Sequence, residues 1–115
     1  MMKTKKNNSR AVGHNYEREI RKELIELGWV NCQTSRYASK MLDDNLVDYT
    51  ETQPFQIQAK RWKSAPSYHE ILKKMPQNEN YNIIIHKRPQ KGEVVVMDKQ
   101  SFYEIVRMLR AEGII

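Results

Sequence analysis

Several features that would narrow the class of protein are scarce in this chain of 115 residues. A single cysteine, Cys32, excludes a disulfide within the chain and is typical of a reducing compartment. The four glycines form no phosphate-binding glycine loop. No run approaches the ~18 apolar residues that cross a bilayer, and no apolar stretch follows the basic N-terminus as in a secretory signal. We therefore expect a soluble cytoplasmic protein without a membrane partner.

Charge, by contrast, is abundant. Charged residues make up 30% of the chain and the net charge is +6, which favours a polyanionic partner such as nucleic acid. The length suits one domain with one core. Residues 1–12 are polar, rich in Lys and Asn and without hydrophobic periodicity, so we interpret them as a flexible basic arm. Residues 13–115 are then the folded domain. The arm is either a plain disordered terminus or a DNA contact.

The hydrophobic pattern predicts a first helix followed by three strands. The helix covers residues 14–27 and ends at Gly28. Its apolar stripe consists of Tyr16, Ile20, Leu24 and Leu27. Residues 29–37, 46–49 and 55–60 are predicted to form an antiparallel meander of strands.

The sequence pattern of the second half of the chain predicts a helix, two strands and a last helix. Ser67 with Glu70 is a capping-box pattern for a short helix ending near Lys74. Residues 81–86 and 94–97 are predicted to be buried strands. A last helix, with Ser101 and Glu104 as its capping box, has an apolar face made of Phe102, Ile105, Val106 and Leu109. The expected fold is an α/β sandwich with a central mixed sheet of five strands and helices on its faces.

One cluster of polar residues carries the most chemistry. A turn centred on Gln53 would pair Asp48 with Gln58 across two strands, about 5 Å apart, and Lys60 would share their face. A carboxylate, an amide oxygen and a backbone carbonyl such as that of Ala59 suit Mg²⁺ or Mn²⁺. With a lysine for the phosphate, these parts suffice for metal-assisted phosphodiester hydrolysis. The same residues are equally compatible with a plain solvated sheet face.

The order of elements and these residues together resemble the PD-(D/E)XK nuclease superfamily, and within it the archaeal and phage Holliday junction resolvases. The family pattern of Glu, Asp and Glu-x-Lys falls on Glu17, Asp48, Gln58 and Lys60. Helix geometry alone does not choose between Glu17 and Glu23, and the resemblance favours Glu17. The resemblance implies a restriction-endonuclease-like sandwich that binds Mg²⁺, with Mn²⁺ as a substitute, through Glu17, Asp48, Gln58 and the Ala59 carbonyl. The chain departs from the family pattern at Gln58, where the family has an acidic residue.

Further residues are candidates for contacts to DNA. The family often has a serine-bearing loop after the first strand, and Ser35 or Ser39 in TSRYASK is in that place, although both are equally compatible with simple loop residues. A basic run with Trp62 follows the third strand, and a basic hairpin follows the fourth. The expected DNA-binding residues are Lys3, Lys5, Lys6, Arg10, Ser35, Arg36, Ser39, Lys40, Arg61, Lys63, Lys87 and Arg88.

The sequence therefore predicts a Mg²⁺-dependent endonuclease that resolves four-way DNA junctions by paired phosphodiester hydrolysis. Two symmetric cuts need two active sites, so we expect a homodimer. Two alternatives stay open. One is the same fold acting on flaps, nicks or a restriction-type site, and the other is a non-catalytic DNA-binding protein with a degenerate nuclease site, which Gln58 favours.

Overall fold

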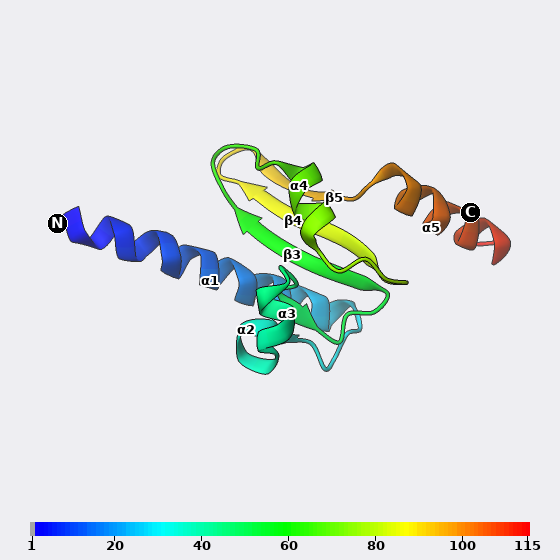
Figure 1. Cartoon of the computed structure of the whole chain (residues 1–115), viewed down its shortest axis with the longest axis horizontal. Coiled ribbons are helices and arrows are strands. Elements are labelled where there is room, and N and C mark those ends of the chain that lie inside the picture. The colour runs from blue at the N-terminus through cyan, green and yellow to red at the C-terminus, as the bar shows by residue number, and fades with distance from the viewer. Residues whose placement is uncertain (1) are drawn as a thin grey trace.

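The computed structural model describes the backbone of residues 2–115 and the side chains of residues 10–115. Helices and strands combine into a mixed α/β fold, as predicted (Figure 1). The elements in order are α1 (Met2–Leu27), β1 (Gln33–Thr34), α2 (Ser35–Ala38), α3 (Lys40–Asp44), β2 (Tyr49–Thr50), β3 (Phe55–Arg61), α4 (Tyr68–Lys74), β4 (Tyr81–Arg88), β5 (Gly92–Val96) and α5 (Lys99–Ala111).

The main sheet has three strands in the order β3-β4-β5. β3 runs parallel to β4, and β5 runs antiparallel to β4. Parallel neighbours need a crossover connection, and α4 lies in that connection. The central strand β4 contains Ile83, Ile84 and Ile85 and is largely buried, as its continuous apolar run predicts.

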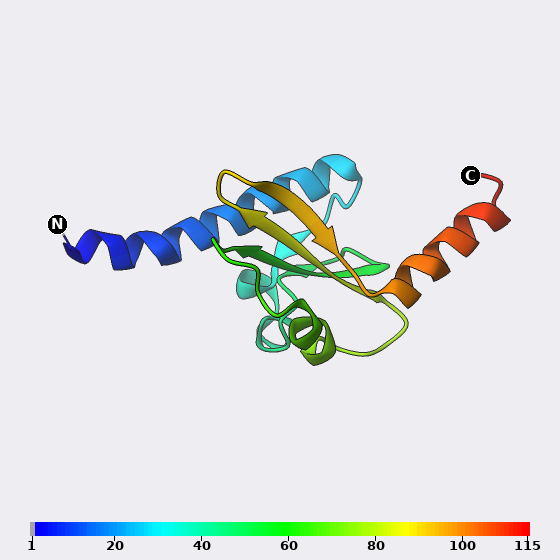
Figure 2. The ribbon, with the colours of Figure 1, turned by 90° about the horizontal axis from the view of Figure 1, so that it is seen from above.

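Two helices cover the two faces of this sheet, as Figure 2 shows from above. On one face α1 buries Tyr16, Ile20 and Leu24 in a core that also contains residues of β3 and β4. On the other face Tyr68 of α4 hydrogen-bonds His86 of β4 through Nδ1 at 2.7 Å. Leu27, predicted to belong to the buried stripe, is 75% exposed because it lies at the last residue of α1, at the edge of the core.

The predicted five-stranded sheet is not formed among the described residues. β1 and β2 make a separate antiparallel pair. Between β2 and β3 the backbone makes one bond, from Asp48 N–H to the Ile57 carbonyl at 2.8 Å. The Asp48 side chain then accepts from the N–H of Ala59 at 2.7 Å. The Asp48 carboxylate therefore occupies the N–H of Ala59, which a continuing strand would otherwise use. The predicted antiparallel meander ends at this point.

The segment predicted as a flexible arm is helical, because α1 begins at Met2. Its N-terminal part extends beyond the sheet (Figure 1). The side chains of Lys3, Lys5 and Lys6 lie outside the described residues, and Arg10 is exposed. The irregular backbone expected for residues 1–12 was wrong, while the flexibility of this segment stays a prediction.

The C-terminal elements also differ from expectation. β5 was expected to be buried, yet Val94 and Val95 are 53% and 58% exposed, because β5 is an edge strand. α5 begins at Lys99 rather than at Ser101, since the carboxylate of Asp98 caps it by accepting from Ser101 N–H at 2.8 Å. α5 then projects away from the sheet (Figures 1 and 2). Within the described chain, no helix has the length and apolar character of a membrane span.

Candidate metal and phosphate site

Asp48 is the buried centre of the predicted site. It is only 7% exposed. Its Oδ2 atom accepts hydrogen bonds from Gln58 Nε2 at 2.8 Å and from the backbone N–H of Ala59 at 2.7 Å. The predicted proximity of Asp48 and Gln58 is therefore confirmed. The solvated sheet face is excluded for this pair, because Gln58 is also buried.

Burial changes the acidity of this carboxyl group. Loss of solvation raises the pKa of Asp48 to about 7, and the negative charge of Glu17 acts in the same direction. The N–H of Ala59 and the charge of Lys60 lower the pKa but do not compensate for burial. Glu17 and Lys60 are therefore near enough to Asp48 to act on its charge. A cation at this position would favour the ionised form.

Gln58 contributes an unsatisfied oxygen to the same place. Its Nε2 donates to Asp48 Oδ2. Its Oε1 is buried and has no hydrogen-bond partner among the described residues. A buried acceptor without a partner costs roughly 1–3 kcal/mol. A bound cation or its water would satisfy this oxygen, so the orphaned atom fits a ligand of a hard metal ion.

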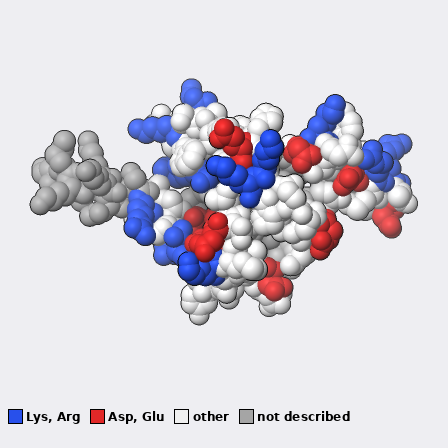
Figure 3. Space-filling view, in the orientation of Figure 1, with Lys and Arg blue, Asp and Glu red and all other residues white. Residues whose placement is uncertain are grey.

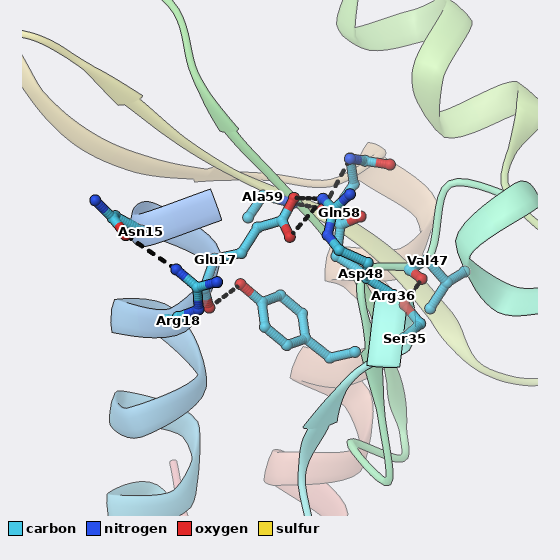
Figure 4. Close-up of polar contacts among 10 residues, drawn as sticks. Asn15, Glu17, Arg18, Ser35, Arg36, Val47, Asp48, Gln58 and Ala59 are labelled. Carbon is cyan, nitrogen blue, oxygen red and sulfur yellow. Dashed lines mark hydrogen bonds and ion pairs between the residues drawn. The ribbon is translucent and has the colours of Figure 1, made fainter. Parts of the chain in front are cut away.

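Glu17 reaches the site from α1 but is paired with a cation of the chain itself. Arg36 Nη2 lies 2.9 Å from Glu17 Oε1 and 3.1 Å from Oε2. The hydrogen bond to Glu17 raises the pKa of Arg36 further above its usual value. The Tyr49 hydroxyl donates to the backbone carbonyl of Glu17 at 2.8 Å and fixes this turn of α1 against β2. Figure 4 shows Glu17, Arg36, Asp48 and Gln58 brought together from α1, α2, the start of β2 and β3.

A cavity of about 640 Å³ opens beside these residues. Of the predicted catalytic residues, Glu17, Gln58 and Lys60 line it, together with Ala59. Asp48 lies behind Gln58 and Ala59, to which it is hydrogen-bonded. The structure therefore brings the predicted catalytic and metal-binding residues to one place, with Asp48 joined to it through Gln58 and Ala59.

The rim of this cavity is basic and aromatic. Arg61, Trp62 and Lys63 line it immediately after Lys60. Trp62 is 45% exposed, which excludes full burial in the core, and Lys60 Nζ lies 4.6 Å from the centroid of its ring. The space-filling view shows Lys and Arg side chains gathered around this part of the molecule with acidic groups among them (Figure 3). Such a rim suits a phosphate backbone.

The two serines of the loop have structural contacts. Ser35 is fully buried, its hydroxyl donates to the Val47 carbonyl, and its N–H donates to the Asp48 carbonyl at 2.8 Å. Ser39 caps α3, where its hydroxyl accepts from Leu42 N–H at 3.3 Å. The expected DNA contact of Ser35 was wrong for this conformation, because its hydroxyl faces the interior. Ser35 instead holds the backbone that presents Asp48.

The other expected DNA contacts have mixed environments. Arg36 is engaged by Glu17, and Lys40 makes an exposed ion pair with Asp44 at 3.2 Å. Arg88 Nε donates to the Lys63 carbonyl at 2.7 Å, which joins the basic hairpin to the rim of the cavity. The remaining positions are at least partly exposed; they are Arg10, Arg61, Lys63 and Lys87.

The donor set is less acidic than a complete carboxylate cluster. Among the described residues, no group of three or more His, Cys, Asp or Glu side chains is arranged to hold a metal ion. The site instead offers the carboxylates of Asp48 and Glu17 and the amide oxygen of Gln58. These are all hard oxygen donors of the kind that Mg²⁺ and Mn²⁺ accept, so the residues present fit such an ion.

Comparison with models of protein families, with curated proteins and with solved structures found no match to this chain. The site must therefore be interpreted from its own geometry. The partner of Glu17 was not predicted from the sequence, because Arg36 is 19 residues away on another helix. Two basic residues close to Glu17 on α1 bind elsewhere: Arg18 donates to Asn15 and Arg21 donates to the Cys32 carbonyl.

Proposed function

We propose that this protein is a Mg²⁺-dependent endonuclease that cuts branched DNA, with four-way junctions as the preferred substrate and a restriction-endonuclease-like ancestry for its fold. The observation that carries the proposal is the position of Asp48. It is buried beneath a basic cavity, hydrogen-bonded to Gln58 and Ala59, with Glu17 and Lys60 beside it. Glu17, Asp48 and Lys60 match the nuclease pattern of the PD-(D/E)XK superfamily, and Gln58 occupies the position where that pattern has an acid.

In this proposal Asp48, Glu17, the Gln58 amide oxygen and the Ala59 carbonyl hold the metal ion. When bound, Mg²⁺ supplies a more acidic water and a positive charge beside the phosphoryl oxygens. Gln58 keeps the Asp48 carboxylate oriented through its Nε2 donor. Arg36 has to release Glu17 for this carboxylate to serve as a ligand, and the freed guanidinium is then available to a phosphate.

Lys60 has a separate role in the proposal. Lys60 lines the cavity, and its Nζ atom lies 4.6 Å from the centroid of the Trp62 ring. Lys60 stabilises the negative charge that builds on the phosphate during hydrolysis. Arg61, Lys63, Lys87 and Arg88 bind neighbouring phosphates and set the register of the DNA strand.

Cleavage assays with paired variants test the proposal. Asp48→Asn and Lys60→Ala should each lower the Mg²⁺-dependent cleavage rate by at least ~100-fold, which is the order expected for loss of a single charge-stabilising group. Both should still bind junctions, because most phosphate contacts remain. Lys73→Ala, on the exposed side of α4, is the matched control and should cleave normally. Wild-type-like rates for both site variants would remove the site from the proposal.

The substrate preference needs its own comparison. Matched four-way, forked, nicked and linear duplexes should be offered to the wild-type protein with Mg²⁺ and separately with Mn²⁺. We expect the four-way junction to be cut fastest and in two symmetric strands, which requires two copies of the chain. Faster cutting of flaps, nicks or linear DNA would assign the same chemistry to another substrate.

One observation favours a second candidate function, a DNA-binding protein without catalysis. Gln58 replaces the acid of the nuclease pattern, and Glu17 is neutralised by Arg36. A protein of this kind would bind junctions in the presence of a chelator and cut nothing with either metal. In both functions the single, buried Cys32 suits a reducing cytoplasm, since burial raises the pKa of its thiol and keeps it neutral.

A further inference from the structure

α5 is an amphipathic helix whose apolar side is only partly covered. Phe102, Ile105, Val106 and Leu109 fall on one stripe at helical spacing. All residues of α5 are at least partly exposed, and Phe102 is 52% exposed. The comparable stripe of α1 is buried, with Ile20 only 2% exposed. α5 points away from its own sheet (Figures 1 and 2), so its stripe requires a surface that its own fold does not provide.

A matching apolar surface is uncovered on the other side of β5. A groove of about 280 Å³ lies between α1 and β5, with Ile20, Ile85 and Val95 among its lining residues. Val95 pairs with Ile85 across the ladder, yet it is 58% exposed because it belongs to the edge strand. Glu23 and Glu93 also line the groove and make it acidic.

The two surfaces are complementary in charge as well as in polarity. At 100° per residue, Lys99 and Arg110 fall on one flank of the α5 stripe. They would meet the carboxylates of Glu23 and Glu93 at the groove. The chain therefore has a basic-flanked apolar helix and an acidic-flanked apolar groove that receives no helix of its own.

We propose that α5 of one chain docks in the α1–β5 groove of a second copy, and reciprocally, to form a two-fold dimer. The connection between β5 and α5 is only Met97 and Asp98, and it directs the helix away from its own groove. A second copy presents the same helix to the same groove, which gives a closed, isologous contact. The proposed function already requires two copies of the chain, and this inference names the contact that joins them. The contact is argued from the surfaces of α5 and the groove alone, so an inactive protein would leave it intact.

The test is the mass of the full chain in solution, measured by sedimentation or light scattering. The wild-type protein should have twice the mass of one chain. Val95→Asp, in the groove, and Leu109→Asp, on the stripe, should each be monomeric, with circular dichroism showing that both are folded. Met108→Asp is the control, because Met108 is exposed on α5 but lies off the stripe, and it should stay dimeric.

Mixing the two variants distinguishes this arrangement from any other interface. The Val95→Asp chain retains a sound helix and the Leu109→Asp chain retains a sound groove, so the mixture restores one of the two docking contacts. A mixed dimer should form where each variant alone is monomeric. A monomeric wild-type protein, variants that remain dimeric, or folded variants that do not associate when mixed would each overturn the proposal.

Discussion

Asp48 is held in a metal-free setting that favours its neutral form. Its pKa is about 7 in the folded chain, against the usual 3.8, chiefly because it is buried. The folded state therefore binds a proton more tightly than the unfolded state between these two values. Stability falls as the pH rises through this window and is constant above it. Without a cation, the ionised Asp48 side chain therefore destabilises the folded state.

The first prediction at the residue scale follows from this loss of stability with rising pH. In the presence of a chelator, Asp48→Asn should unfold at a higher temperature than the wild type at pH 8, with the difference shrinking towards pH 4. The asparagine side chain is neutral and its oxygen can accept from Ala59 N–H. Its amide group can donate to Gln58 Oε1 after the Gln58 amide flips by 180°. Thermal unfolding across pH checks this, with the exposed Asp44→Asn as control. A difference that does not change with pH would contradict the raised pKa.

The second residue-scale prediction concerns Gln58. Gln58→Glu places a second carboxylate beside Asp48, so it should lower the melting temperature without metal and give a larger rise on addition of Mg²⁺. It should also lower the Mg²⁺ concentration needed for half-maximal cleavage.

Gln56→Glu is the matched control for this change. Gln56 is on the same face of β3 and equally buried, but it binds Asn82 and the Pro76 carbonyl rather than Asp48. Its variant should be destabilised without rescue by Mg²⁺. Equal rescue of both variants would mean that the metal ion does not bind at Gln58.

At the scale of elements, hydrophobic periodicity predicted where the main helices and strands lie. The stripe of α1, the alternation of β3 and the apolar run of β4 identified these elements because local patterns determine them. The helix of α4 was also predicted, although Ser67 makes no side-chain cap. The stripe of α5 predicted an amphipathic helix, but periodicity does not say which surface covers it.

The candidate site was predictable to the same degree. Asp48 and Gln58 are ten residues apart around one turn, and their proximity was predicted correctly, although a side-chain hydrogen bond joins them and not a continuous pair of strands. The ion pair of Glu17 with Arg36 spans 19 residues and depends on how α2 packs on α1. Likewise, Ser35 is buried because it contacts Val47, 12 residues away, and no local sequence pattern predicts this contact.

The element-scale prediction concerns the start of α1. Removal of residues 1–10 should lower affinity for four-way junctions several-fold, because Lys3, Lys5, Lys6 and Arg10 are lost with their phosphate contacts. The melting temperature should change little, since Tyr16 is the first buried residue among the described side chains of α1. Binding and thermal unfolding of the truncated protein check both parts. Full affinity would make the segment a passive terminus, and a large loss of melting temperature would show that it packs on the domain.

At the scale of the whole molecule, charge would determine how DNA is bound under the proposed function. The net charge of +6 and the basic rim of the cavity predict that phosphates dominate affinity. Junction affinity should therefore fall steeply as salt rises, because bound counterions are released from the DNA. Competition assays at several salt concentrations should show four-way junctions outcompeting linear duplex of the same sequence. Equal competition at physiological salt would remove the preference for junctions.

The long first helix has a mechanical consequence. α1 is one continuous helix that joins the hydrophobic core at Tyr16, with about 20 Å of helix ahead of that residue at 1.5 Å per residue. Tilting of this leading part about Tyr16 would move each residue in proportion to its distance from Tyr16. Glu17 is the next residue, so it would be displaced very little. Under the proposed function, DNA that binds the start of α1 would therefore leave the Glu17 carboxylate in place beside Asp48.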